Sequence, residues 1–115
     1  MLKISGMTVD GVFILKLEGK LDSITSEDLE KKMASLLTGN EKTFLIDFEK
    51  LHYISSFGLR IIIGIAKKVK AEGNNFYLAS MNESVREIFE VTGLLSVFDT
   101  FSSVAEAVKH IKNLS

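Results

Sequence analysis

A six-residue segment near the middle of the chain, Thr43 to Phe48, places the tightest limit on the fold. Its sequence, TFLIDF, is short and almost wholly apolar. A strand with one exposed face alternates apolar and polar residues, whereas a strand covered on both faces reads as a continuous apolar run. The segment therefore predicts a central strand with other elements packed over both of its faces.

The chain begins with two further β-rich segments. Leu2 to Val9 and Val12 to Glu18 are separated by Asp10-Gly11. An Asp-Gly pair between two strand-like runs is a strong signal for a hairpin. We therefore expect the first two strands to be antiparallel.

Four segments carry apolar residues at the spacing of a helix. Each opens near a Ser, Thr or Asn that can cap free backbone N–H groups, and three end near a glycine. The predicted helices run from Thr25 to Gly39, from Ser55 or Ser56 to Gly73, from Asn82 to Gly93, and from Ser103 onward. Two more strands are predicted at Asn75 to Ala79 and at Val97 to Phe101.

The resulting order of elements is ββαβαβαβα. Strands that are joined through a helix run parallel and cross over in the right-handed sense. A chain of 115 residues, 46% of them hydrophobic, can bury the core of one compact domain. We therefore predict a single α/β domain over residues 1–115, with a mixed sheet that starts as an antiparallel hairpin and continues as right-handed parallel βα units.

Charge and composition exclude several classes of partner. The chain has 14 basic and 15 acidic residues, which gives no reason to expect a nucleic acid. It has no apolar run of about 18 residues, so we expect no membrane insertion. Cysteine is absent, which removes disulfides and thiolate chemistry and fits a reducing compartment. We expect a cytoplasmic protein.

Two serines stand where the central strand gives way to the second helix, in the stretch YISSFGLRIII. In open α/β sheets, ligands and partners dock at the ends of strands that lead into helices. In one reading, Ser55 or Ser56 caps that helix and has no further role. Alternatively, the helix dipole and the free N–H groups can accommodate a phosphate, so that a serine there accepts a phosphoryl group without melting the helix.

Three motifs, by their order and spacing along the chain, resemble those of the STAS-domain proteins, the bacterial anti-sigma-factor antagonists. The family signature Y-[IM]-D-S-[SA]-G-L-G is similar to the run from Tyr53 to Arg60, YISSFGLR. The stretch GKLDSIT, from Gly19 to Thr25, resembles the family element G-x-L-D-x-x-T, and VTGL, from Val91 to Leu94, resembles a later turn. Ser55, Phe57 and Arg60 differ from the family's usual residues.

The resemblance implies a STAS-like fold and a function as a switch in transcription regulation. The phosphorylated serine of the family falls on Ser56, with Ser55 as the less favoured acceptor. The implied partner is an anti-sigma factor that is also a serine kinase, which binds the unmodified antagonist and releases the phosphorylated one. A metal-dependent serine phosphatase then restores the serine. ATP and Mg²⁺ belong to the kinase, so the resemblance implies no cofactor for this chain.

We expect the partner to contact residues around this junction. A wheel at 100° per residue places Phe57 and Ile61 opposite the core stripe of the second helix, where they can form a docking patch. Arg60 lies one turn after Ser56 and can reach a phosphate there. Family resemblance adds Asp22, which can also simply turn the chain before the first helix. The full predicted surface is Asp22, Ser55, Ser56, Phe57, Arg60 and Ile61, whereas Thr25 is expected to be a helix cap.

Three other readings compete with the switch. A hydrolase could use either serine with His52 and Asp22 or Asp47, but no G-x-S-x-G elbow is present, and we expect no enzyme and no metal site. A phospho-aspartate receiver could use Asp47, taken as the end of the central strand, but it lacks an acidic pair after the first strand. In that position Asp47 is better explained as a turn or capping residue. The runner-up is a scaffold or transporter-regulating interaction module in which Ser56 is never phosphorylated.

Overall fold

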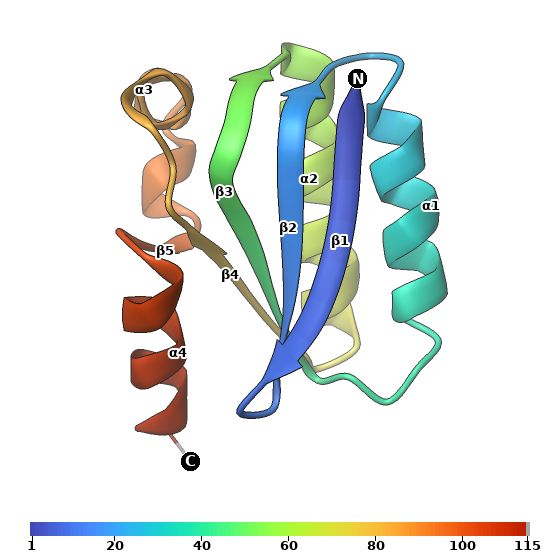
Figure 1. The fold of residues 1–115 in the computed structure, drawn as a ribbon, viewed down its shortest axis with the longest axis vertical. Helices are drawn as coiled ribbons and strands as arrows, with labels where there is room; N and C mark the ends of the chain where they lie inside the picture. The colour runs from blue at the N-terminus through green and yellow to red at the C-terminus, as the bar shows by residue number, and fades with distance from the viewer. Residues whose placement is uncertain (115) are drawn as a thin grey trace.

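A five-stranded mixed sheet forms the middle of the molecule (Figure 1). The computed structural model describes residues 1–114. The strands lie in the order β1 (Leu2–Val9), β2 (Val12–Leu21), β3 (Thr43–Ile54), β4 (Asn75–Ala79) and β5 (Asp99–Phe101). β1 pairs antiparallel with β2, and the other neighbours pair parallel. The predicted fold class is therefore confirmed.

The hairpin between β1 and β2 depends on its two turn residues. Asp10 and Gly11 both have positive φ, 50° and 80°, and Val9 pairs directly with Val12. Two successive positive φ angles are what a tight two-residue hairpin turn requires, and Asp and Gly tolerate them better than most residues. The Asp-Gly pair thus sets the register of the first two strands.

Four α-helices and one short 3₁₀ turn complete the fold. They are α1 (Ser26–Leu36), α2 (Ser56–Ala71), α3 (Glu83–Val91), the 3₁₀ turn η1 (Leu94–Ser96) and α4 (Val104–Lys112). The larger hydrophobic cluster joins one face of the sheet to buried residues of α1, α2 and α3. The smaller cluster joins the other face to α4. Figure 1 shows this arrangement, with α1 and α2 together on one side and α4 across the sheet.

The apolar segment that opens β3 is covered on both faces, as predicted. Phe44 and Ile46 belong to the cluster under α1 and α2, whereas Leu45 belongs to the cluster under α4. All five residues from Phe44 to Phe48 are buried. Successive side chains of a strand point to opposite faces, so both layers of the core meet in this one segment.

β3 is longer than the sequence predicts. It continues for six residues beyond Phe48, because Leu51 and Ile54 are also buried in the core. Their spacing of three departs from the alternation of a regular strand, and the pairing of β2 with β3 contains register shifts at the same level. Asp47 therefore lies inside the strand, and the expectation that it ends the strand as a turn or capping residue was wrong.

The start of α2 approaches the end of β2 so closely that a side chain would not fit. A Cβ atom added to Gly58 would lie 2.8 Å from the Leu21 carbonyl oxygen and 3.1 Å from Ile54. A Cβ added to Gly64, six residues later in the same helix, would meet no atom within 4 Å. Gly58 is thus required by packing, and Gly64 is not.

We predict opposite effects of alanine at these two glycines. Gly58→Ala should lower the free energy of unfolding by about 1 to 3 kcal/mol, because the new methyl group overpacks the contact with β2. Gly64→Ala should raise it by about 0.5 to 1 kcal/mol, because alanine is the better helix former. Urea unfolding of both variants measures the difference, and a stabilised Gly58→Ala variant would contradict the close packing.

Candidate functional site

The ends of β2 and β3 bring two loops together. The strands are parallel, and their last residues, Leu21 and Ile54, are partners in the sheet. The Ser55 N–H donates a 2.9 Å hydrogen bond to the Leu21 carbonyl, which ties the start of α2 to the end of β2. The loop that leads from β2 into α1 therefore lies beside the first turn of α2.

Asp22 and Thr25 hold that loop in shape. The Asp22 carboxylate accepts hydrogen bonds from the Ile24 N–H at 3.0 Å and the Thr25 N–H at 2.9 Å. The Thr25 hydroxyl accepts from the Asp22 N–H at 2.9 Å and donates to the Lys20 carbonyl at 2.8 Å. Asp22 thus turns the chain before α1, as one reading of the sequence predicted.

The expectation that Thr25 caps α1 was wrong. Its hydroxyl makes no capping bond, and its backbone is already helical, with φ −75° and ψ −20°. A capping side chain needs an extended backbone at its own residue. Thr25 is instead 6% exposed and uses its hydroxyl inside the loop.

The two serines have different roles. Ser55 has an extended backbone, and its side chain accepts a 3.0 Å hydrogen bond from the Gly58 N–H, so Ser55 is the cap of α2. Ser56 is the first residue of the helix and is exposed. Within residues 1–114 the Ser56 hydroxyl has no hydrogen-bond partner. The capping role and the exposed hydroxyl thus fall on separate residues.

The predicted apolar patch on α2 is only partly outward. Phe57 is 41% exposed, and the Arg60 guanidinium carbon lies 5.7 Å from the centre of its ring. Ile61, which the wheel placed outward, is half-buried and packs against the core. Arg60 thus contacts Phe57 in this structure, and of the two apolar residues only Phe57 is exposed.

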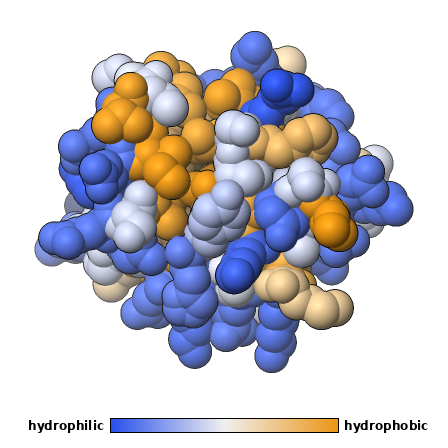
Figure 2. Space-filling view, turned by 90° about the horizontal axis from the view of Figure 1, so that it is seen from above, coloured by the Kyte–Doolittle hydropathy of each residue, from blue (hydrophilic) through white to orange (hydrophobic). Residues whose placement is uncertain are grey.

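Two exposed apolar residues near this end of the molecule were missed from the sequence. Ile24, in the loop before α1, is 79% exposed, and Tyr53, near the end of β3, is 49% exposed. Figure 2 looks onto this end and shows apolar side chains on its surface among polar ones. Contiguous exposed apolar patches are typical of protein-binding surfaces, whereas single exposed apolar residues are ordinary. The position of Ile24 in the turn after Asp22 could have indicated from the sequence that its side chain is exposed.

Within residues 1–114, no hydrogen bond joins either serine to His52, Asp22 or Asp47, the residues of the alternative catalytic readings. Asp47 lies inside β3, where its carboxylate accepts a hydrogen bond from the Glu49 N–H at 3.0 Å.

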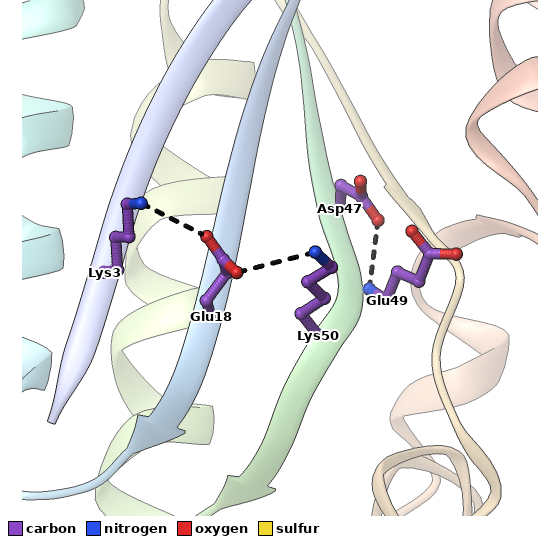
Figure 3. A network of polar contacts seen from close by, with 5 residues as sticks. All are labelled: Lys3, Glu18, Asp47, Glu49 and Lys50. Carbon is purple, nitrogen blue, oxygen red and sulfur yellow. Dashed lines mark hydrogen bonds and ion pairs between the residues drawn. The ribbon is translucent and has the colours of Figure 1, made fainter.

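A separate polar network lies on the sheet near Asp47 (Figure 3). Glu18 pairs there with Lys3 at 4.0 Å and with Lys50 at 3.8 Å. Across residues 1–114, no group of three or more histidines and carboxylates is placed to hold a metal ion. Nor is any helix in this part of the chain long and apolar enough to cross a membrane.

We predict that the Asp22 carboxylate titrates below the usual range of aspartate. The Thr25 N–H lowers its pKa most, and the Ile24 N–H and the Thr25 hydroxyl lower it further. Because folding lowers this pKa, the ionised group stabilises the folded chain above the ordinary aspartate pKa, and this contribution is lost as the pH falls through the lowered value. NMR titration of the side-chain carboxyl measures the pKa, and a value above the ordinary one would contradict the loop geometry.

The comparisons with known proteins agree on one family. The model of the STAS domain family matches residues 4–107. BtrV of Bordetella bronchiseptica, whose name places it among the anti-sigma factor antagonists, is 32% identical over 111 residues, which are 96% of each chain. The anti-sigma-B factor antagonist of Staphylococcus aureus is 26% identical over 81% of this chain and 86% of its own.

Solved structures share the fold. An anti-sigma factor antagonist from Mycobacterium paratuberculosis superposes with a TM-score of 0.89 at 20% identity, over 97% of this chain and 95% of its own. SpoIIAA of Bacillus in its phosphorylated form gives a TM-score of 0.73 at 20% identity, over 96% of this chain and 99% of its own. At these identities the likeness concerns the fold, and the family model covers most of the sequence. This chain belongs to the STAS domain family.

Proposed function

We propose that this chain is an anti-sigma factor antagonist that works as a protein-binding switch. In its unmodified form it binds an anti-sigma factor that is also a serine kinase, and phosphorylation of Ser56 ends the binding. The observation that carries the proposal is the exposed, unbonded Ser56 hydroxyl at the start of α2. The names of the two relatives support it, because both are called anti-sigma factor antagonists.

The first turn of α2 suits a phosphate on Ser56. The first N–H groups of a helix have no partner within it, and the helix dipole favours negative charge there. Ser55 already caps the Gly58 N–H, so Ser56 can be modified without loss of the cap. In the transfer, the Ser56 oxygen gives up its proton and bonds the γ-phosphorus of the kinase's ATP, and ADP leaves. A metal-dependent serine phosphatase would hydrolyse the ester and restore the hydroxyl.

The replacement of the family's usual aspartate by Ser55 is compatible with this role. Aspartate and serine are both strong helix caps, and Ser55 makes the capping bond in this structure. The substitution therefore keeps the start of α2 and removes one negative charge beside the phosphate. Repulsion between that charge and a phosphate on Ser56 is absent in this chain.

Phosphorylation would change the surface that a partner meets. A phosphoserine carries a charge of about −1.5 to −2 and three strong acceptor oxygens. Placed beside the exposed ring of Phe57, this charge would have to be desolvated in any apolar contact. Arg60, which now contacts the Phe57 ring, can turn toward the phosphate and pair with it, and this would change the surface around Phe57. Both effects favour release of a partner that binds through Phe57.

The alternative is a scaffold or transporter-regulating module in which Ser56 stays unmodified. The same fold occurs in a sulfate transporter family protein from Wolinella succinogenes, with a TM-score of 0.76 at 15% identity. That likeness concerns the fold alone. The unbonded Ser56 hydroxyl favours the switch, since a scaffold needs only the cap that Ser55 supplies.

Ser56→Ala and Ser55→Ala separate the two readings. With the cognate kinase and ATP, the wild-type chain should gain one phosphate, and Ser56→Ala should gain none. Ser55→Ala should still be phosphorylated while losing about 0.5 to 2 kcal/mol of stability with its cap. Intact-protein mass spectrometry reads the phosphate. If the active kinase leaves the wild-type chain unmodified, the scaffold is the better account.

Substitutions at Phe57 and Ile61 test the docking surface. Phe57→Ser should abolish capture of the anti-sigma factor with little change in melting temperature, because the ring is already 41% exposed. Ile61→Ser should lower the melting temperature, because this side chain packs against the core. Pull-down and thermal unfolding of both variants measure these effects. Full capture by Phe57→Ser would place the docking surface elsewhere.

A further inference from the structure

A shallow apolar hollow lies between the second half of α2 and the segment around η1. Its apolar lining comes from Ile63 and Ala66 of α2 and from Leu94, Val97 and Phe98 beyond α3. Val97 is 60% exposed, although its neighbour Phe98 is buried in the core. The hollow therefore continues the hydrophobic core to the surface at a place where no element of the described chain covers it.

The size of the hollow indicates what it can hold. Its volume is about 100 Å³. Sites for drug-sized ligands measure about 300 to 1,000 Å³ and enclose most of the molecule. The hollow is thus too small for such a ligand, but it has room for an apolar side chain presented by another protein.

Its polar rim is entirely basic. Lys67 and Lys70, one turn apart on α2, are the two charged residues that line it. From Ser56 to Ala71, α2 has four basic residues and no acidic one. At 100° per residue, Arg60 and Ile63 fall on the same flank of the helix as these lysines, whereas Lys68 projects from a different flank. No ion pair within residues 1–114 involves Lys67 or Lys70.

We propose that this hollow docks an acidic amphipathic helix of a partner protein. An apolar residue of that helix enters the hollow, and carboxylates one turn to either side pair with Lys67 and Lys70. Helices recognised in grooves present their anchors at this spacing of three and four residues. The apolar lining of the hollow and the two lysines beside it are complementary to the apolar and acidic faces of such a helix.

An anionic membrane surface would fit the hollow less well than an acidic helix does. The chain as a whole has a net charge of −1. α3, which contacts η1 beside the hollow, carries three glutamates, Glu83, Glu87 and Glu90, against one arginine. These charges would repel a flat anionic surface, whereas a single helix can lie along α2 and avoid them.

This docking site does not depend on the Ser56 switch. Lys67 lies 11 positions after Ser56, which is about 16 Å along a helix. Charges on the surface that are separated by more than about 8 to 10 Å are largely screened at physiological salt. A negative charge at Ser56 should therefore leave binding in the hollow within about twofold of its original strength.

A designed peptide tests the proposal with the full-length chain. The probe is a fluorescein-labelled, lactam-stabilised helix of about two turns, with leucine along one face and glutamate on both sides of it. Fluorescence anisotropy should show saturable binding, and NMR should show shifts at Ile63, Leu94 and Val97. The double variant Lys67→Glu/Lys70→Glu should weaken binding about tenfold or more, and Val97→Asp should do the same.

Matched controls make the result specific. Lys68→Glu makes the same charge change as Lys67→Glu alone, but on another flank of α2, and should weaken binding less than Lys67→Glu does. Val91→Asp changes a valine that is 77% exposed, more than Val97 at 60%, and that lies outside the hollow, so it should leave binding intact. Ser56→Glu should bind the peptide as the wild type does, so that failure of the switch and failure of the hollow can be told apart.

Three outcomes would overturn the proposal. The first is no saturable binding, or equal binding of a peptide whose glutamates are replaced by lysine. The second is an equal loss in Lys68→Glu and Lys67→Glu/Lys70→Glu, which would indicate unspecific attraction to the basic helix. The third is binding to phosphatidylserine vesicles, lost in the double variant, without binding of the peptide, which would make the hollow a membrane contact.

Discussion

The contact between the start of α2 and the end of β2 sets the geometry of the whole site. One hydrogen bond, from the Ser55 N–H to the Leu21 carbonyl at 2.9 Å, joins the two backbones. The missing side chain of Gly58 allows them to approach. Because Leu21 leads into the loop of Asp22 and Thr25, the same contact places that loop beside the exposed serine. A side chain at Gly58 would push these two backbones apart.

Ser55 and Ser56 have separate roles in the proposed switch. Ser55 supplies the bond that the helix needs, and its hydroxyl is turned to the Gly58 N–H. Ser56 supplies a hydroxyl that the fold does not use. In the proposed switch, phosphorylation of Ser56 would therefore change the charge of the surface while the core and the cap stay as they are. The proposed docking hollow lies further along the same helix, so one element would present two independent surfaces.

Most of the fold could be predicted from the sequence because its signals are local. The Asp-Gly turn, the apolar run of β3 and the caps Ser55, Asn82 and Ser103 each act within a few residues, and all three caps make the expected bonds. The length of β3 could not be predicted, because Leu51 and Ile54 are spaced for an irregular strand whose pairing depends on β2.

The surface of the site was harder to predict, since it depends on neighbours that are distant in sequence. A helical wheel gives the direction of Ile61 but not the width of the core beside it, and so placed a half-buried residue in solvent. Threonine is a residue type that often caps helices, but the turn formed by Asp22 places the backbone of Thr25 in the helical region. The exposure of Phe57 was predicted correctly, because this residue lies directly opposite the core stripe of α2.

The central claim is that a phosphate on Ser56 breaks partner binding without unfolding the start of α2. Calorimetric titration of the anti-sigma factor with unmodified and Ser56-phosphorylated protein tests it most directly, with amide exchange at Gly58 followed in both forms. We expect the phosphorylated form to bind about a hundredfold more weakly and the Gly58 amide to stay protected in both. Equal affinity of the two forms, or loss of protection at Gly58 on phosphorylation, would contradict the account.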